Sequence, residues 1–258
     1  MMNFHRVCLV LCCGLLPALC FSGCAKKDDA LARVHAAGAL RVGVDPSWPP
    51  FEFVQSDGQI AGLDVDLARA LGQKLGVEVQ FVVSGWEGLY GALATGQFDA
   101  IISALPYDPW RTQEVAYSSA YFNAGPVIVA HAGQTGLRHV KDLNGYTVHV
   151  EFGAESDVQA RRLRKKYPQM VIAPHDTAQA ALEALCKEPT QAAIVDAVSA
   201  RLYIRAHRRL EIVGEPLYDE SYVIAVPAAA RSLQTAIDEA LIEMRENGEL
   251  DAILERWL

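Results

Sequence analysis

Two successive runs of alternating strand and helix patterns constrain the fold of this 258-residue chain more than any other feature. Apolar, β-branched stretches typical of strands alternate with stretches in which apolar residues recur at helical spacing. In the first run the strands are expected at 39–44, 77–83 and 98–104, and the helices at 63–75 and 86–96. Strands that are joined by helices pair in parallel through right-handed crossovers. The first half of the chain is therefore expected to form an α/β unit.

The second run repeats this pattern after a segment, 107–125, that contains turn signals and no long helix. Its strands are expected near 146–150, 170–173, 192–195 and 210–213, and its helices near 155–167, 177–187 and 196–207. Two further helices, separated near Gly248, end the chain. The simplest arrangement joins the two units through strands at 126–131 and 221–227 and returns the final helices to the first unit. A cleft between two hinged lobes is a preferred ligand site.

The first 24 residues form a separate segment. His5 and Arg6 precede 14 mostly apolar residues, which is the pattern of a secretion signal and is short for a membrane-spanning helix. An N-terminal membrane anchor is the alternative. The stretch 21–24, Phe-Ser-Gly-Cys, resembles a bacterial lipobox, although Phe21 departs from the usual aliphatic residue. The resemblance implies that 1–23 is a signal peptide, that Cys24 carries lipid, and that 24–37 is a tether holding the protein at an extracytoplasmic membrane surface.

Charge and cysteine content exclude several functions. Without residues 1–23 the chain has 22 basic and 31 acidic residues, a net charge of −9, which argues against a nucleic-acid partner. Cys186 is the single cysteine after Cys24, and its helical pattern predicts a buried, inert thiol. The histidines are scattered, so we expect neither a metal site nor a cofactor.

The loop 44–53, Val-Asp-Pro-Ser-Trp-Pro-Pro-Phe-Glu-Phe, places rigid rings beside a carboxylate. Ordinary surface loops are rich in Gly, Asn and Ser, so these rings either fill a core or face a ligand. Phe51 and Phe53 alternate around Glu52, and one of the two rings is expected to pack inward.

Several stretches resemble the extracytoplasmic solute-binding proteins of polar amino-acid ABC importers. They are LRVGVDPSWPPFEF, GQIAGLDVDLARALGQKLGVEVQFV, GLYGALATGQFDAIIS, VGEPLYDESYVIAVP and ENGELDAILERWL. The resemblance spans 38–258 and implies a bilobal type II periplasmic-binding-protein fold, with two α/β lobes joined by two crossing hinge segments. Lobe 1 would comprise 38–127 and 222–258, and lobe 2 would comprise 128–221, with the solute gripped between them.

The resemblance also implies roles for individual residues. Asp45, Trp48 and Trp86 would line the cleft, Arg111 would clamp a ligand carboxylate, and Asp196 would accept a ligand ammonium. A guanidinium holds a carboxylate through two parallel hydrogen bonds, and tryptophan faces stack on planar or cationic groups. Each residue has a purely structural alternative: a turn for Asp45, core packing for the two tryptophans, a surface ion pair for Arg111, and a helix N-cap for Asp196.

Two departures from the family pattern bear on the ligand. The segment before Arg111 usually offers hydroxyls and a free N–H to a ligand carboxylate, but here it contains Ala104 and Pro106. Glu155 stands at a helix start where the family usually has Thr, and it would compete with an anionic ligand group for the same donors. With Asp45 and Asp196, Glu155 gives an acidic lining, which favours a cationic or amine-bearing solute.

The leading hypothesis is therefore a non-enzymatic, monomeric, lipid-anchored receptor that binds an amino acid or amine and delivers it to a cognate ABC permease. The first alternative is an enzyme of the cyclohexadienyl dehydratase type, with Glu155 as a general acid. The second is a sensory or scaffold lipoprotein whose cleft has diverged.

Overall fold

The structure is a computed structural model that describes residues 28–188 and 191–258. The expected signal peptide and Cys24 lie outside the described residues. None of the described helices is long and apolar enough to cross a membrane.

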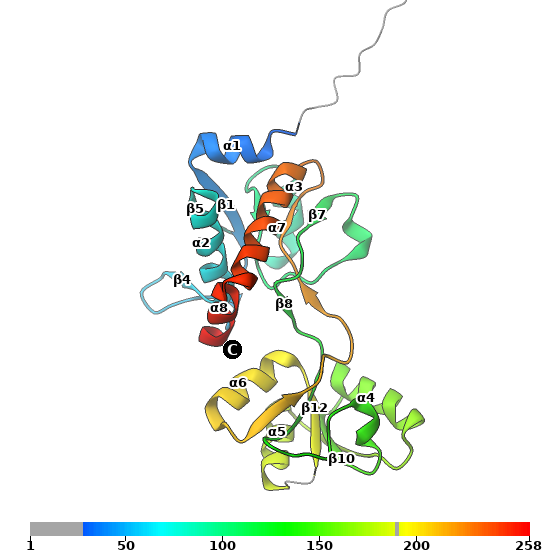
Figure 1. The fold of residues 1–258 in the computed structure, drawn as a ribbon. Helices are drawn as coiled ribbons and strands as arrows, with labels where there is room; N and C mark the ends of the chain where they lie inside the picture. The colour runs from blue at the N-terminus through cyan, green and yellow to red at the C-terminus, as the bar shows by residue number, and fades with distance from the viewer. Residues whose placement is uncertain (1–27, 189–190) are drawn as a thin grey trace, which may run out of the picture.

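Two α/β lobes lie one above the other (Figure 1). The helices are α1 Ala30–Ala37, α2 Leu63–Leu75, α3 Leu89–Ala94, α4 Glu155–Lys166, α5 Ala178–Lys187, α6 Ala197–His207, α7 Arg231–Glu246 and α8 Glu249–Trp257, with short 3-10 turns η1 Trp86–Gly88, η2 Pro109–Arg111 and η3 Val140–Leu143.

The first lobe is built on a five-stranded sheet in the order β5-β1-β6-β15-β7. Its strands are β1 Ala39–Val44, β5 Glu78–Val83, β6 Ala100–Ile101, β7 Val115–Tyr117 and β15 Ala225–Pro227. β1 pairs in parallel with β5 and β6, as the alternating pattern predicts, whereas β15 runs antiparallel to β6 and β7. A three-stranded ribbon, β2 Ser47–Trp48, β3 Glu52–Val54 and β4 Ile60–Ala61, follows β1.

The second lobe repeats this design. Its sheet has the order β11-β10-β12-β9-β13, with two parallel pairings around β10 and antiparallel pairings on both sides of β9. The strands are β9 Val127–His131, β10 Thr147–Glu151, β11 Val171–His175, β12 Ala192–Val195 and β13 Leu210–Val213. Strands and helices in this lobe lie within one or two residues of the positions predicted from the sequence.

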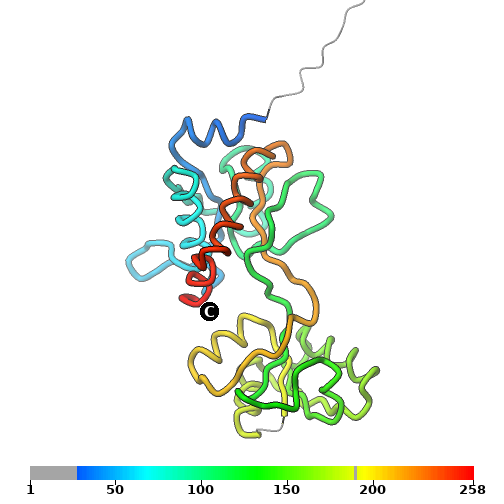
Figure 2. The backbone as a smooth tube through the Cα atoms, in the orientation of Figure 1, coloured from blue at the N-terminus to red at the C-terminus, as the bar shows by residue number. Residues whose placement is uncertain are grey.

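The chain crosses between the lobes twice, and the crossings run side by side (Figure 2). β8 Phe122–Asn123 and β14 Ser221–Tyr222 pair antiparallel. Further backbone bonds extend the ribbon on both sides: the Ala124 N–H donates to the Glu220 carbonyl at 3.0 Å, and the Tyr121 N–H donates to the Tyr222 carbonyl at 2.9 Å. We call this β8–β14 pair and its flanking bonds the hinge ribbon, because two crossing segments between lobes are where a hinge can bend.

The C-terminal helices return to the first lobe, where α7 and α8 pack against α2 and each other. Asp66 of α2 accepts from Arg256 at 2.8 Å and from the Trp257 indole at 2.9 Å, and Lys74 pairs with Glu243 at 2.6 Å. These contacts hold the last residues of the chain against an early helix.

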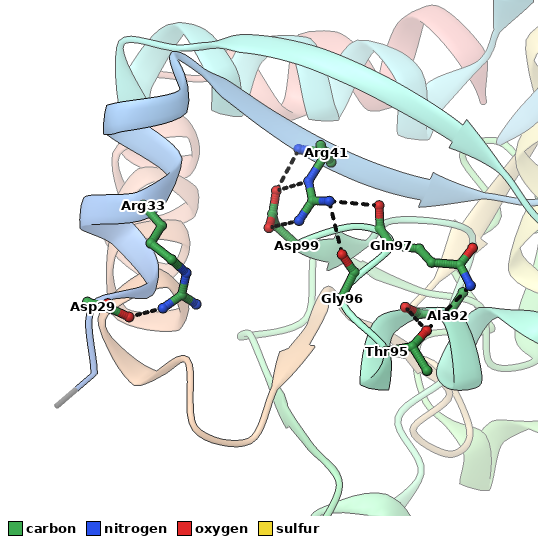
Figure 3. A network of polar contacts seen from close by, with 8 residues as sticks. All are labelled: Asp29, Arg33, Arg41, Ala92, Thr95, Gly96, Gln97 and Asp99. Carbon is green, nitrogen blue, oxygen red and sulfur yellow. Dashed lines mark hydrogen bonds and ion pairs between the residues drawn. The ribbon is translucent and has the colours of Figure 1, made fainter. Parts of the chain in front are cut away.

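A guanidinium fixes the end of the connection from β5 through α3 to β6. Arg41 of β1 contacts Asp99 through Nη2 at 2.7 Å and Nε at 3.1 Å, and Nη1 donates to the Gly96 and Gln97 carbonyls (Figure 3). Gly96 has φ 74°, in the left-handed region expected for the helix stop at this position. Arg41 thereby satisfies two carbonyls of the loop that follows α3.

The structure corrects several expected boundaries. The helix expected over 86–96 is a 3-10 turn followed by α3, and the strand expected over 98–104 pairs only at 100–101. The strand expected over 221–227 is divided into β14 and β15, because its first part pairs in the hinge ribbon and its last part in the sheet.

The expected tether over 24–37 is wrong for residues 28–37. Ala30 and Val34 are buried, and α1 contacts α7, where the Leu31 N–H donates to the Ser232 hydroxyl at 3.2 Å. This segment is therefore a packed part of lobe 1.

Candidate functional site

A hollow of about 400 Å³ opens in lobe 1 beside the hinge ribbon. It lies where the parallel strands β1 and β6 end. The carboxyl ends of parallel strands meet at one edge of a sheet, and ligands commonly bind outside that edge. Its lining residues are Asp45, Ser47, Trp48, Glu52, Trp86, Ala104, Pro106, Glu220 and Tyr222. Three of them are acidic and three are aromatic, and none of these described lining residues is Lys or Arg.

The two tryptophans are not core residues. Trp48 is 58% exposed and Trp86 is 45% exposed, although both border the hollow. Phe51 is the ring that packs inward: it is fully buried and meets Tyr222 edge-on, with ring centroids 5.3 Å apart. The loop therefore uses one ring as an anchor and leaves Trp48 free at the surface.

Asp45 combines the expected ligand position with a structural role. One carboxylate oxygen accepts from the Ser47 hydroxyl at 2.8 Å, and the other accepts from the Trp86 N–H at 2.9 Å. These bonds fix the loop carrying Trp48 relative to the turn carrying Trp86. Carboxylate oxygens accept more than one hydrogen bond, so Asp45 retains capacity toward the hollow.

Beneath the hollow lies a buried polar network that sequence reasoning missed. The Ser103 hydroxyl donates to Glu52 Oε1 at 2.8 Å and accepts from the Asp45 N–H at 3.0 Å. Asp64 Oδ2 accepts from the Tyr121 hydroxyl at 3.0 Å and from the Ala104 N–H. Glu52 is 1% exposed and Asp64 is fully buried. Two carboxyl groups thus share one apolar site.

Two ionised carboxylates cannot share such a site without large cost. Burial first, and then the negative charge of Asp64, raises the pKa of Glu52 to about 10. Burial also raises the pKa of Asp64, to about 6, against the hydrogen bonds from the Ala104 N–H and the Tyr121 hydroxyl. The pair therefore holds one proton at neutral pH, and that proton resides on Glu52.

The structure shows where Ala104 and Pro106, the two residues that differ from the family pattern before Arg111, lie relative to the hollow. Ala104 adopts φ 41°, a conformation disfavoured for a residue with a Cβ, and its N–H donates to Asp64 below the hollow. Pro106 has no N–H and its ring lines the wall. Neither residue offers a donor to a ligand carboxylate.

Arg111 lies in a neighbouring hollow that shares Trp86 and Pro106 with the first. Its guanidinium stacks over Tyr90, 4.2 Å from the ring centroid, and pairs with Glu114 at 3.0 Å and Asp108 at 3.5 Å. The surface ion pair weighed as an alternative for Arg111 is thus present. It leaves the guanidinium largely neutralised before a ligand arrives.

The two site residues predicted in lobe 2, Glu155 and Asp196, do not line the hollow. Glu155 is exposed at the start of α4, where it accepts from Gln159 at 2.7 Å. The neighbouring carboxylate of Asp157, which is 3% exposed, accepts from the Gly153 N–H at 3.2 Å and pairs with Arg161. Asp157 therefore occupies the N–H of Gly153, just before the N-cap Ala154, whereas no hydrogen bond from a helix-start N–H to Glu155 is present among the described residues.

Asp196 is the N-cap of α6 and accepts from the Ser199 N–H at 2.8 Å. Its charge nevertheless reaches the site. Burial, followed by the charges of Glu220, Asp64 and Asp196, raises the pKa of Tyr222, whose ring lines the hollow. Asp196 therefore influences the hollow through its negative charge on Tyr222, although its side chain does not line the hollow.

Three lining residues had no sequence signal that singled them out. Glu52 occupies the position between two alternating phenylalanines that normally faces solvent, and the β2–β3 ribbon turns it inward instead. Glu220 and Tyr222 belong to the second crossing, whose pairing with the first brings them beside residues 45–52.

Comparisons with known proteins identify the family. Residues 40–258 match the bacterial extracellular solute-binding proteins, family 3. The chain is 26% identical over 250 residues to the L-cystine-binding protein TcyJ of Escherichia coli K12, covering 95% of this chain and 93% of TcyJ. It is 27% identical over 220 residues to the arginine-binding extracellular protein ArtP of Bacillus subtilis, covering 84% of this chain and 85% of ArtP.

A solved structure of an ancestral cationic amino-acid solute-binding protein, AncCDT-1, is 30% identical, with a TM-score of 0.64. The likeness covers 88% of this chain and 98% of that one. AncCDT-1 is described as a precursor of cyclohexadienyl dehydratase. With two α/β lobes joined by two crossing segments, a hollow at the hinge and a family match over most of its length, the chain belongs to the family 3 bacterial extracellular solute-binding proteins.

Proposed function

We propose that this protein is the receptor of an ABC importer and that its ligand is a cationic or amine-bearing solute of the amino-acid class. The observation that carries the proposal is the lining of the hollow: carboxyl groups from Asp45, Glu52 and Glu220 beside the faces of Trp48 and Trp86. An ammonium or guanidinium gains from both features, through ion pairing and through attraction to the ring faces.

The carboxylate end of an amino acid has a separate place to go. Arg111 lies in the adjoining hollow, on the other side of Trp86 and Pro106. We assign Arg111 the ligand carboxylate, in exchange for its present partners Glu114 and Asp108. Because this exchange replaces one ion pair by another, the carboxylate contributes less affinity than a free guanidinium would give.

Closure of the lobes brings the remaining residues to the ligand. We assign 38–127 and 222–258 to lobe 1 and 128–221 to lobe 2, with bending at the β8–β14 ribbon. Closure moves Asp196 and Glu155 toward the hollow, where they add negative charge around a cation. A solute favours closure only if it binds the closed form more tightly than the open form, and contacts from both lobes provide that preference.

The membrane part of the proposal rests on the sequence before residue 28. We propose that 1–23 is removed as a signal peptide and that Cys24 carries the lipid that holds a monomer near its permease. Labelling cells with a palmitate analogue is expected to label the wild-type protein but not Cys24→Ser. Equal labelling of both proteins would refute lipidation at this position.

Calorimetric titration with matched ligand pairs tests the ligand class. Arginine and lysine are expected to bind, and agmatine and cadaverine, which lack the carboxylate, are expected to bind more weakly but measurably. Glutamine, with a neutral side chain, tests whether a cationic side chain is needed for binding. Glutamate tests the effect of a negatively charged side chain. A preference for glutamate or glutamine over arginine would refute the proposal.

The dehydratase alternative is tested separately. The Glu155 carboxyl, the expected general acid, is exposed and bonded to Gln159, whereas Glu52 is the carboxyl that holds a proton inside the site. We expect no phenylpyruvate to form when purified protein is incubated with prephenate, because prephenate carries two carboxylates and Arg111 is the one Lys or Arg among the described lining residues of the two hollows. A thermal scan that no solute shifts would instead favour the sensory alternative.

A further inference from the structure

The buried carboxyl pair at the bottom of the hollow has a role that packing alone does not explain. A buried carboxyl group costs stability unless its oxygens are paired, so two of them beside a ligand site call for a functional explanation. Glu52 lines the hollow, yet it is 1% exposed. Glu52 therefore belongs both to the wall of the hollow and to the buried network beneath it.

Each carboxyl group has one oxygen with no hydrogen-bond partner among the described residues, Oε2 of Glu52 and Oδ1 of Asp64. The other two oxygens are held by Ser103, Tyr121 and the Ala104 N–H. A proton shared between the two groups satisfies both free oxygens at once. Because the described lining contains no Lys or Arg, this proton is what neutralises one of the two carboxyl groups.

We propose that a cationic ligand replaces this proton: the ligand enters as the proton leaves Glu52 for solvent, so that binding is a one-for-one exchange of cations. The proposal rests on the function proposed above. Before binding, the pair consists of a carboxylic acid and a carboxylate; afterwards it consists of two carboxylates and one ligand cation. The net charge of the buried site is the same in both states, which avoids the cost of burying additional charge.

The other titratable groups around the pair allow this exchange. Asp45 lies above Glu52 and adds negative charge that holds the proton. The Tyr121 hydroxyl donates to Asp64, and the Tyr222 ring lines the hollow. Burial raises the pKa of both phenols, so both remain neutral. With these neighbours, neutral pH places the exchangeable proton on the carboxyl pair.

The exchange also favours cationic ligands over neutral and anionic ones. A neutral side chain cannot compensate a second carboxylate, so it leaves the proton in place and gains no ion pair at the bottom of the hollow. An anionic side chain would meet Asp45, Glu220 and Asp64 together. Glu52 is thus proposed as the specificity-determining residue of the site.

Calorimetry in two buffers measures the exchange directly. Arginine is titrated at pH 7 in phosphate and in Tris, whose ionisation enthalpies differ, and the difference in observed heat gives the number of protons released. We expect wild-type protein to release up to one proton per arginine, and its Kd to fall by up to tenfold per pH unit between pH 6 and pH 8. Glu52→Gln keeps the shape of the side chain but cannot ionise, so its proton release and pH dependence are expected to vanish.

A matched control separates this effect from a general loss of charge. Glu246→Gln removes an exposed carboxylate at the end of α7 that lines neither hollow, and it is expected to release protons as wild-type does. Infrared difference spectra provide a second readout: the carbonyl band of a protonated carboxylic acid should disappear when arginine is added to wild-type protein.

The outcomes distinguish the two proposals. Arginine binding without proton release refutes the exchange and leaves the proposed function standing. Equal proton release by wild-type and Glu52→Gln refutes the assignment to Glu52. Binding of glutamine with no binding of arginine, lysine or agmatine refutes the proposed function and, with it, the exchange.

Discussion

The protonated state of Glu52 predicts that Glu52→Gln changes how the stability of the free protein depends on pH. In the unfolded chain Glu52 has its ordinary pKa near 4.5, whereas in the folded protein the pKa is raised to about 10. Between these values the folded protein holds a proton that the unfolded chain has released. The stability that Glu52 contributes is therefore fully present below pH 4.5 and is lost as the pH rises toward 10.

The magnitude follows from one proton. A difference of one bound proton changes the free energy of unfolding by about 1.4 kcal/mol per pH unit. Between pH 6 and pH 8, wild-type protein should thus lose about 2 to 3 kcal/mol more stability than Glu52→Gln. The variant should also be the more stable protein at pH 8, because its amide is neutral at no cost and donates to Asp64 as the carboxylic acid did.

Urea unfolding followed by tryptophan fluorescence at pH 6, 7 and 8 measures this difference. Glu246→Gln, at an exposed position of α7, is the control for any carboxyl-to-amide change, and its pH profile should run parallel to that of wild-type protein. If the profiles of wild-type and Glu52→Gln are also parallel, Glu52 is ionised in the free protein, and the reasoning about the buried pair is wrong.

Three further substitutions test individual contacts. Trp86→Ala should weaken arginine binding by about 0.5–2 kcal/mol, or 2- to 30-fold by calorimetry, because a cation loses a ring face; unchanged affinity would remove Trp86 from the site. Arg111→Ala should weaken arginine but spare agmatine, and equal losses for both would show that Arg111 does not hold the carboxylate. Asp196→Ala should destabilise the protein by about 1 kcal/mol through loss of the N-cap, whereas Asp196→Asn should keep stability and still lose affinity; an Asn variant with full affinity would leave Asp196 with only a structural role.

Much of the fold was predictable because the alternation of strands and helices is a local signal. The bounds of α2, β1, β12 and β13 coincide with those read from the sequence. Errors arose where tertiary pairing decides the outcome. The stretch 221–227 has a uniform strand pattern, and only its pairing partners divide it between hinge and sheet. Residues 28–37 read as part of a polar tether, yet Ala30 and Val34 bury against the lobe.

The site was predictable only in part, for a related reason. Asp45, Trp48 and Trp86 lie within four residues of the ends of β1 and β5, so this edge of the sheet brings them together. Glu52 and Glu220 reach the same hollow through the β2–β3 ribbon and the second crossing, which no local pattern reports. The lobe 2 residues Asp196 and Glu155 depend on how far the lobes close, and that angle is set by the ligand as well as by the sequence.

A crystal structure of the protein with arginine would show directly whether a ligand cation binds against Glu52. We expect a closed molecule in which the guanidinium lies against Trp48 or Trp86 and within hydrogen-bond distance of Glu52, with the carboxylate on Arg111. Arginine bound with its guanidinium in solvent and the hollow beside Glu52 filled only by water would contradict it.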